Sequence, residues 1–147
     1  MTREEATEMI LEAKKTHDLT FEAIANKVGK HKVWTTSALL GQAQMTPEEA
    51  DAVVSLLDLP PEVADALQEF PMKGSLDADV PTDPLIYRFH EVTQVYGTTL
   101  KALIHEEFGD GIMSAIDFTM EVEREEDPAG DRVKVTYSGK FLPYKKW

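Results

Sequence analysis

The chain has 147 residues, 27 acidic against 15 basic side chains and no cysteine. The missing thiol excludes a disulfide scaffold, a thiolate zinc or iron–sulfur site and a cysteine nucleophile. The net charge of −12 makes the molecule as a whole repel phosphate backbones and anionic lipid surfaces, unless basic groups are locally segregated. The N-terminus lacks the apolar core of a secretory signal, and no apolar run could span a bilayer. We therefore expect a cytoplasmic protein without a nucleic-acid or membrane partner.

The first half of the chain has the apolar spacing of short amphipathic helices. The spacing predicts helices over 4–15, 20–28, 32–40 and 46–57, and a fifth that begins at 60 and ends before Pro71. Thr20 and Thr46 are suited to cap the second and fourth of these, and Pro47 suits a first helical position. Gly29 and Gly41 mark two of the helix ends.

This succession of short helices, with Ile24, Ala25 and Gly29 near one turn, resembles the helix-turn-helix domain of phage repressors. A DNA-binding regulator is therefore the alternative function. Lys30 and Lys32 begin the candidate recognition helix, but apolar residues follow them and leave little polar reach for base edges. Many such bundles bind no DNA, so we interpret these lysines as a solvated helix end.

The character of the chain changes after Pro71. Turn-forming residues fill 71–80 without any helical stripe, which predicts a linker and two domains, 1–75 and 76–147. Asp83 and Pro84 then suit a helix start, and the pattern predicts one helix to about residue 96, before Gly97, and another over 98–108.

The last third of the chain changes from helical to strand periodicity. After a short turn or helix through 113–115, apolar and polar residues alternate from Phe118 to Glu123 and again from Val133 to Tyr137. This pattern predicts a β-hairpin with one buried face, closed by a loop over 125–131. The predicted fold class is thus α+β. Because two helices and a lone hairpin bury little apolar surface, we expect another subunit to complete the C-terminal half.

Three residues in the second half could carry chemistry. Arg88 and Glu91 are three positions apart on a predicted helix, so their side chains are separated by about 60° around the axis and can reach one site. They can form a plain surface ion pair, or the guanidinium can bind a small planar anion while the carboxylate orients it or handles a proton. Ser114 has no evident activating base, which favours a turn residue or a hydrogen-bond donor to an anion over a nucleophile. The histidines lack metal-site spacing.

Several stretches of the second half closely resemble sequences of the cyanase family, whose members are also called cyanate hydratases or cyanate lyases. A thinner match lies in the first half, so the resemblance covers essentially the whole chain. The matching stretches are Ala38-Leu39-Leu40-Gly41-Gln42, Pro81-Thr82-Asp83-Pro84, Tyr87-Arg88-Phe89 with Glu91, the runs 94–106 and 108–116, and Gly139-Lys140-Phe141-Leu142-Pro143. Two residues depart from the family pattern: His90, where tyrosine is familiar in bacterial members, and Asp117, where asparagine is familiar.

The resemblance implies a repressor-like helical N-terminal domain that is not used for DNA, and a C-terminal domain interlocked with a partner into a dimer. It further implies five dimers in a decamer with active sites between subunits. The implied reaction combines cyanate with bicarbonate to give carbamate and carbon dioxide, and carbamate then decomposes to ammonia and a second carbon dioxide. The resemblance also implies that no metal or organic cofactor takes part and that bicarbonate is a co-substrate. The family's catalytic residues fall on Arg88, Glu91 and Ser114.

Overall fold

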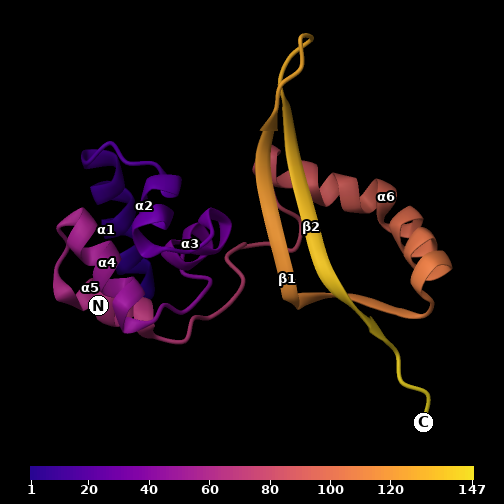
Figure 1. The fold of residues 1–147 in the computed structure, drawn as a ribbon, viewed down its shortest axis with the longest axis horizontal. Helices are drawn as coiled ribbons and strands as arrows, with labels where there is room; N and C mark the ends of the chain where they lie inside the picture. The colour runs from indigo at the N-terminus through magenta and orange to yellow at the C-terminus, as the bar shows by residue number, and fades with distance from the viewer. The chain divides into compact units, whose positions relative to one another are not determined.

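The computed structural model describes all 147 residues, as six α-helices and one two-stranded antiparallel sheet (Figure 1). The α+β class predicted from the sequence is confirmed. The chain forms two compact units, Met1–Ser75 and Leu76–Trp147. The first unit is all helical, and the second holds the longest helix and the sheet.

The first unit is a bundle of five short helices, three of which begin at a threonine cap. Thr2, Thr20 and Thr46 each accept a backbone N–H from the first turn that follows, and Thr2 and Thr46 form full capping boxes with Glu5 and Glu49. These bonds satisfy N–H groups that have no partner inside the helix. All five predicted helices are present: α1 (Arg3–Thr16), α2 (Phe21–Val28), α3 (Lys32–Leu39), α4 (Pro47–Leu57) and α5 (Pro61–Gln68).

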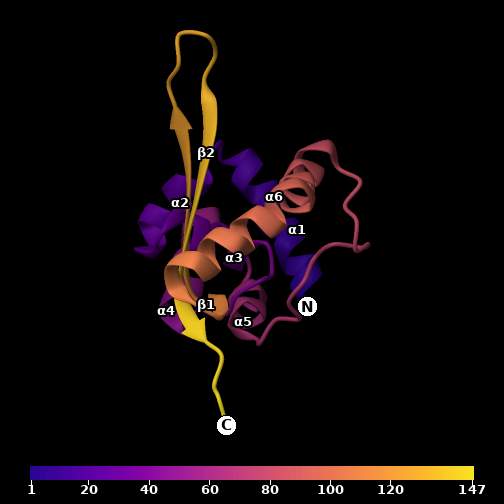
Figure 2. The same ribbon diagram turned by 90° about the vertical axis from the view of Figure 1, so that its right-hand side faces the viewer.

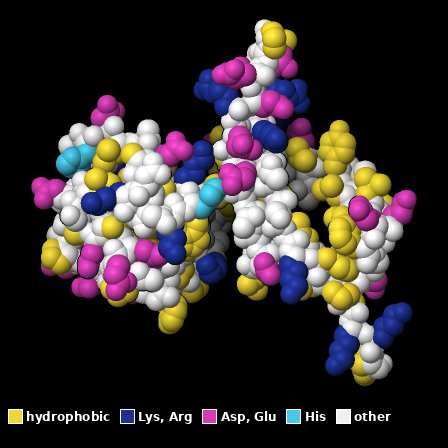
Figure 3. Space-filling view, viewed as in Figure 1, with side chains coloured by type: hydrophobic (Ala, Val, Ile, Leu, Met, Phe, Trp, Pro, Cys, Tyr) yellow, Lys and Arg dark blue, Asp and Glu magenta, His cyan; other side chains and the backbone are white.

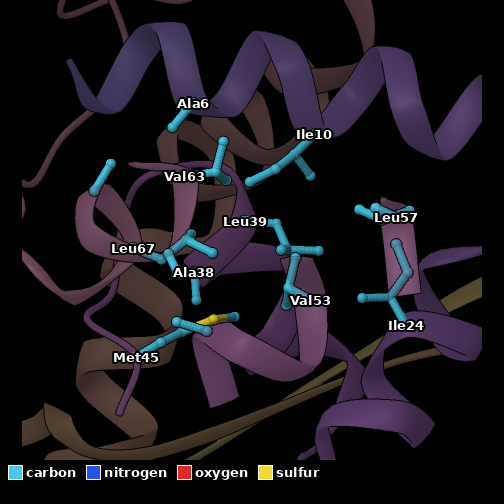
Figure 4. Packing of buried hydrophobic residues seen from close by; sticks show 13 residues of the cluster. Ala6, Ile10, Ile24, Ala38, Leu39, Met45, Val53, Leu57, Val63 and Leu67 are labelled. Atoms are coloured by element: carbon cyan, nitrogen blue, oxygen red, sulfur yellow. The ribbon is translucent and has the colours of Figure 1, made fainter. Parts of the chain in front are cut away.

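The core of this unit is formed by aliphatic side chains that all five helices contribute. Ile10 of α1, Ile24 of α2 and Leu39 of α3 are fully buried, and they lie among side chains of α4 and α5 (Figure 4). Truncating such a residue to alanine costs about 2–5 kcal/mol. A bundle of this size therefore depends on a few aliphatic contacts.

Arg3 is a charged side chain that holds the ends of two helices. Its Nη1 donates to the carbonyl of Ala66, and its Nη2 donates to the carbonyls of Ala38 at 3.1 Å and Ala43 at 2.5 Å. Burial lowers the pKa of the Arg3 guanidinium, although the carboxylate of Glu69 opposes this shift. Because the last carbonyls of a helix carry partial negative charge, the guanidinium stabilises the ends of α3 and α5.

The second unit begins with one continuous helix, α6 (Pro84–Phe108). The prediction of two helices divided at Gly97 was wrong. Gly97 lies within the helix, and a β-carbon there would meet only the Thr93 Cγ2 atom at 3.8 Å. A single glycine costs a helix about 1 kcal/mol relative to alanine, which is too little to end a helix whose hydrogen bonds continue.

No helix of the structure, α6 included, combines the length and apolar character that crossing a membrane requires.

The sheet of the second unit is the predicted hairpin, but its strands are longer than predicted. β1 (Gly111–Glu125) and β2 (Arg132–Pro143) pair antiparallel from Glu125↔Arg132 to Gly111↔Pro143. The turn or helix predicted over 113–115 is absent, because β1 already begins at Gly111. The strand is instead interrupted by a bulge between Met113 and Phe118, and this interruption breaks the alternation that marks a strand in the sequence.

The second unit buries very little apolar surface. No residue of α6 is buried, and the predicted buried face of the hairpin is only half-covered at Phe118, Met120 and Val135. Figure 3 shows hydrophobic side chains gathered on the surface of this unit. Large exposed apolar side chains include Leu85, Val92, Val95, Leu100, Leu103, Phe108 and Ile116.

Candidate active site

Arg88 and Glu91 lie in the first turns of α6. Asp83 caps this helix by accepting the backbone N–H groups of Leu85 and Ile86, at 2.9 and 3.0 Å. The cap fixes where the helix begins, and with it the direction in which the side chains of the following turns project. The structure brings the two predicted residues together: Nη1 of Arg88 lies 3.5 Å from a carboxylate oxygen of Glu91.

The Arg88 guanidinium is held on one side and open on the other. Its Nε donates to the carbonyl of Pro84 at 3.1 Å, its Nη1 faces Glu91, and its Cζ lies 5.3 Å from the centre of the Tyr87 ring. Nη2 has no partner within the chain, and the side chain is 60% exposed. An ion pair this exposed adds little to stability. An oriented fork with a free N–H edge can instead bind a planar anion through two hydrogen bonds.

Ser114 is a buried residue, 6% exposed, at the start of the bulge in β1. Its Oγ accepts the backbone N–H groups of Ile116 at 3.1 Å and Asp117 at 2.9 Å. A serine hydroxyl has two acceptor positions and one donor hydrogen. Because both acceptor positions are used, the hydroxyl hydrogen is left to donate. This geometry agrees with a turn residue that can also donate a hydrogen bond to an anion.

The three predicted residues do not meet within one chain. No hydrogen bond or ion pair joins Ser114 to Arg88 or Glu91. Figure 2 shows the start of α6, which carries Arg88 and Glu91, well to one side of the hairpin that carries Ser114. One chain therefore presents the guanidinium–carboxylate pair and the serine as two separate surfaces.

The structure offers no cluster for a metal ion. No group of three or more His, Asp or Glu side chains is arranged to hold one. His90 lies 3.5 Å from the side chain of Gln94, and His105 lies 3.4 Å from the carbonyl of Gly111. Both of these histidines lie beside neutral groups of their own unit.

The lysines of the repressor-like segment lie beside acidic side chains. The Nζ of Lys30 lies 3.4 Å from Glu49, and the Nζ of Lys32 lies 4.0 Å from Glu22. A phosphate backbone would have to compete with these carboxylates for the lysines, in a protein of net charge −12. The geometry gives no support to the DNA-binding alternative.

Two features of these surfaces were not predicted from the sequence. The carbonyl of Pro84 orients Arg88, and the spacing of four residues between a helical carbonyl and a long side chain could have indicated it. The bulge around Ser114 was also missed. The sequence does contain a signal for this bulge: the alternation of apolar and polar residues is lost over 114–117, directly before the regular pattern that starts at Phe118.

Two family profiles match this chain in succession. The profile described as "Cyanate hydratase, N-terminal" matches residues 3–71, and the profile described as "Cyanate lyase C-terminal domain" matches residues 78–146. Together they cover nearly the whole sequence.

Full-length relatives support the same grouping. A protein named cyanate hydratase from Dechloromonas aromatica (strain RCB) is 58% identical over 147 residues, and another from Cupriavidus necator is 57% identical, with both alignments covering all of each chain. Among solved structures, the crystal structure of cyanase from T. urticae matches with a TM-score of 0.84 and 41% identity, over 94% of this chain and 96% of that one. The chain therefore belongs to the cyanase family of lyases, also called cyanate hydratases.

Proposed function

We propose that this enzyme decomposes cyanate in a bicarbonate-dependent reaction, giving ammonia and carbon dioxide through carbamate, and so detoxifies cyanate. The observation that carries the proposal is the Arg88 guanidinium, oriented by Pro84 and Glu91 with one N–H edge free for a small anion. The full-length relatives named cyanate hydratase supply the identity of that anion. The negative net charge of the chain does not oppose this, because one guanidinium sets the local potential at short range.

The chemistry can be written without any change of oxidation state. A bicarbonate oxygen attacks the cyanate carbon and forms a dianionic adduct. The adduct takes up one proton and loses carbon dioxide, which leaves carbamate. Carbamate takes up a second proton and breaks its C–N bond to give ammonia and a second carbon dioxide. We propose that no metal or organic cofactor takes part, since none of the three steps requires electron transfer and the Arg88 guanidinium would stabilise the negative charge of the adduct.

The three residues have separate roles in this proposal. Arg88 would offset the repulsion between two anions and stabilise the dianionic adduct. This electrostatic stabilisation is strongest in a site of low dielectric constant. Ser114 would donate its free hydroxyl hydrogen and fix the position of an anion. Glu91 would orient Arg88 or assist proton transfer. Because no base activates Ser114, bicarbonate is the nucleophile and no acyl-enzyme forms.

We further propose that the chain acts as dimers assembled into a decamer, with active sites between subunits, in the cytoplasm. Two features of the C-terminal unit support self-association: α6 buries no residue in the single chain, and Ser114 lies apart from Arg88. A second copy could cover the apolar helix and bring the two surfaces together. Sedimentation at micromolar concentration tests this, and a monomer would contradict it.

The direct test of the reaction is ammonia release from cyanate by the purified enzyme, measured with and without added bicarbonate. We expect release that requires both anions. Release independent of bicarbonate in carbonate-depleted buffer would refute the co-substrate, and no release under any condition would refute the reaction itself.

A further inference from the structure

Gly139 lies on β2 directly beside the bulge that carries Ser114. Gly139 pairs with Phe118, Phe141 pairs with Met113, and residues 114–117 therefore stand opposite Lys140 alone. The bulge folds back over β2, and the carbonyl oxygen of Ser114 comes to lie against the Cα of Gly139.

Steric crowding, and not backbone conformation, explains why glycine is needed at position 139. Gly139 is not among the glycines with positive φ, so its backbone is open to any residue. A β-carbon added there would approach the Ser114 carbonyl oxygen to less than 3.0 Å and would lie 2.6 Å from the Cγ atom of Met113. Real Cβ atoms essentially never show such separations. The side chain of Met113 could move away, but the Ser114 carbonyl can move only with the backbone of the bulge.

Displacement of that carbonyl would displace the serine hydroxyl as well. The Oγ of Ser114 is joined to the N–H groups of Ile116 and Asp117, so the bulge is one hydrogen-bonded loop with the hydroxyl inside it. A shift at the Ser114 backbone therefore changes the place from which the hydroxyl donates. A misplacement of about 1 Å can cost an enzyme about 100-fold in rate.

We propose that Gly139 is a positioning residue for the reaction: its missing side chain seats the Ser114 bulge against β2 and fixes the direction of the Ser114 hydroxyl. This inference rests on the proposed role of Ser114. It adds a requirement for glycine on β2, the strand opposite Ser114, at a residue that itself touches no substrate.

The test compares Gly139→Ala with Gly111→Ala. Gly111 is a matched control, because a β-carbon there also meets the backbone of β2, at the Leu142 carbonyl, as well as the Phe141 ring at 2.5 Å. Both variants strain the same hairpin, but only the first presses on the Ser114 carbonyl. We expect Gly139→Ala to lower kcat about 100-fold, and Gly111→Ala to keep most of the wild-type kcat. A wild-type kcat in Gly139→Ala would overturn the proposal.

A double-mutant cycle separates positioning from a general loss of folded enzyme. In a Ser114→Ala background, Gly139→Ala should lower kcat no further, because the hydroxyl it positions is gone. The same fold-loss in both backgrounds would show a structural defect and overturn the proposal. Hydrogen exchange gives a readout independent of activity: the Ile116 and Asp117 amides should exchange faster in Gly139→Ala than in wild type, and unchanged exchange would also overturn it.

A second variant keeps the test informative if Gly139→Ala does not fold. Met113→Ala removes the movable obstacle and leaves the Ser114 carbonyl as the main neighbour of the new methyl group. Adding Gly139→Ala to Met113→Ala should still lower kcat and speed amide exchange, and no change would contradict the proposal. If wild-type enzyme released no ammonia, the proposed reaction would fail, while amide exchange would still decide whether Gly139 seats the bulge.

Discussion

Replacing Arg88 with lysine tests whether the shape of its side chain, beyond its charge, serves the reaction. In the structure the guanidinium uses Nε on the Pro84 carbonyl at 3.1 Å and Nη1 toward Glu91 at 3.5 Å, which leaves Nη2 for an anion. A lysine ammonium keeps the charge but cannot hold both partners and present a planar N–H edge. The loss of one charged hydrogen bond is worth about 1.5–3 kcal/mol. Since each 1.36 kcal/mol is tenfold, kcat/KM should fall about 10- to 150-fold.

The assay is the initial rate of ammonia release at saturating bicarbonate and varied cyanate. Arg124→Lys is the matched control, because Arg124 also forms an ion pair, with Asp131 at 3.1 Å, and is 77% exposed at the far end of the hairpin. We expect Arg124→Lys to keep the wild-type kcat/KM. If Arg88→Lys also kept it, the fork would have no role and the reasoning about this site would fail.

Four other predictions follow from the structure. Ser114→Ala should lower kcat about 100- to 1,000-fold, the usual cost of one donor to a developing anion, and a smaller loss than tenfold in the ammonia assay would contradict its role. Glu91→Gln should lower kcat by at least about tenfold whether the carboxylate orients Arg88 or moves a proton, and wild-type kcat would exclude both roles. Arg3→Met should lower the urea-unfolding free energy by about 2–4 kcal/mol, because it removes three hydrogen bonds from a charged donor; an unchanged midpoint would argue against this. Co-refolding Arg88→Ala with Ser114→Ala should restore activity that neither has alone, and no recovery would contradict an active site shared between subunits.

The helices of the first unit could be predicted closely because local residues, such as capping threonines and a terminal glycine, determine where they begin and end. Thr20 and Thr46 cap as expected, and Gly29 ends α2 with a φ of 77° that favours glycine. Gly97 shows where this reasoning fails. Within α6 it takes ordinary helical geometry, and a glycine ends a helix only when the chain beyond it turns away.

The candidate site was predictable only in part. The spacing of Arg88 and Glu91 on one helix correctly placed the two side chains beside each other. The place of Ser114 depends on pairing between β1 and β2 and on a bulge that disrupts the alternating pattern, and neither is a local property of the sequence. The distance between Ser114 and the guanidinium depends on how separate elements pack, and this information is non-local.

In the proposed reaction, bicarbonate is consumed as the nucleophile toward cyanate. The measurement is the initial release of carbon dioxide, followed by mass spectrometry with ¹³C-bicarbonate and unlabelled cyanate and corrected for uncatalysed dehydration of bicarbonate. If bicarbonate is the nucleophile, we expect two carbon dioxides for each ammonia, one of them labelled. Release of unlabelled carbon dioxide alone, one for each ammonia, would mean that water attacks cyanate and would refute the role of bicarbonate.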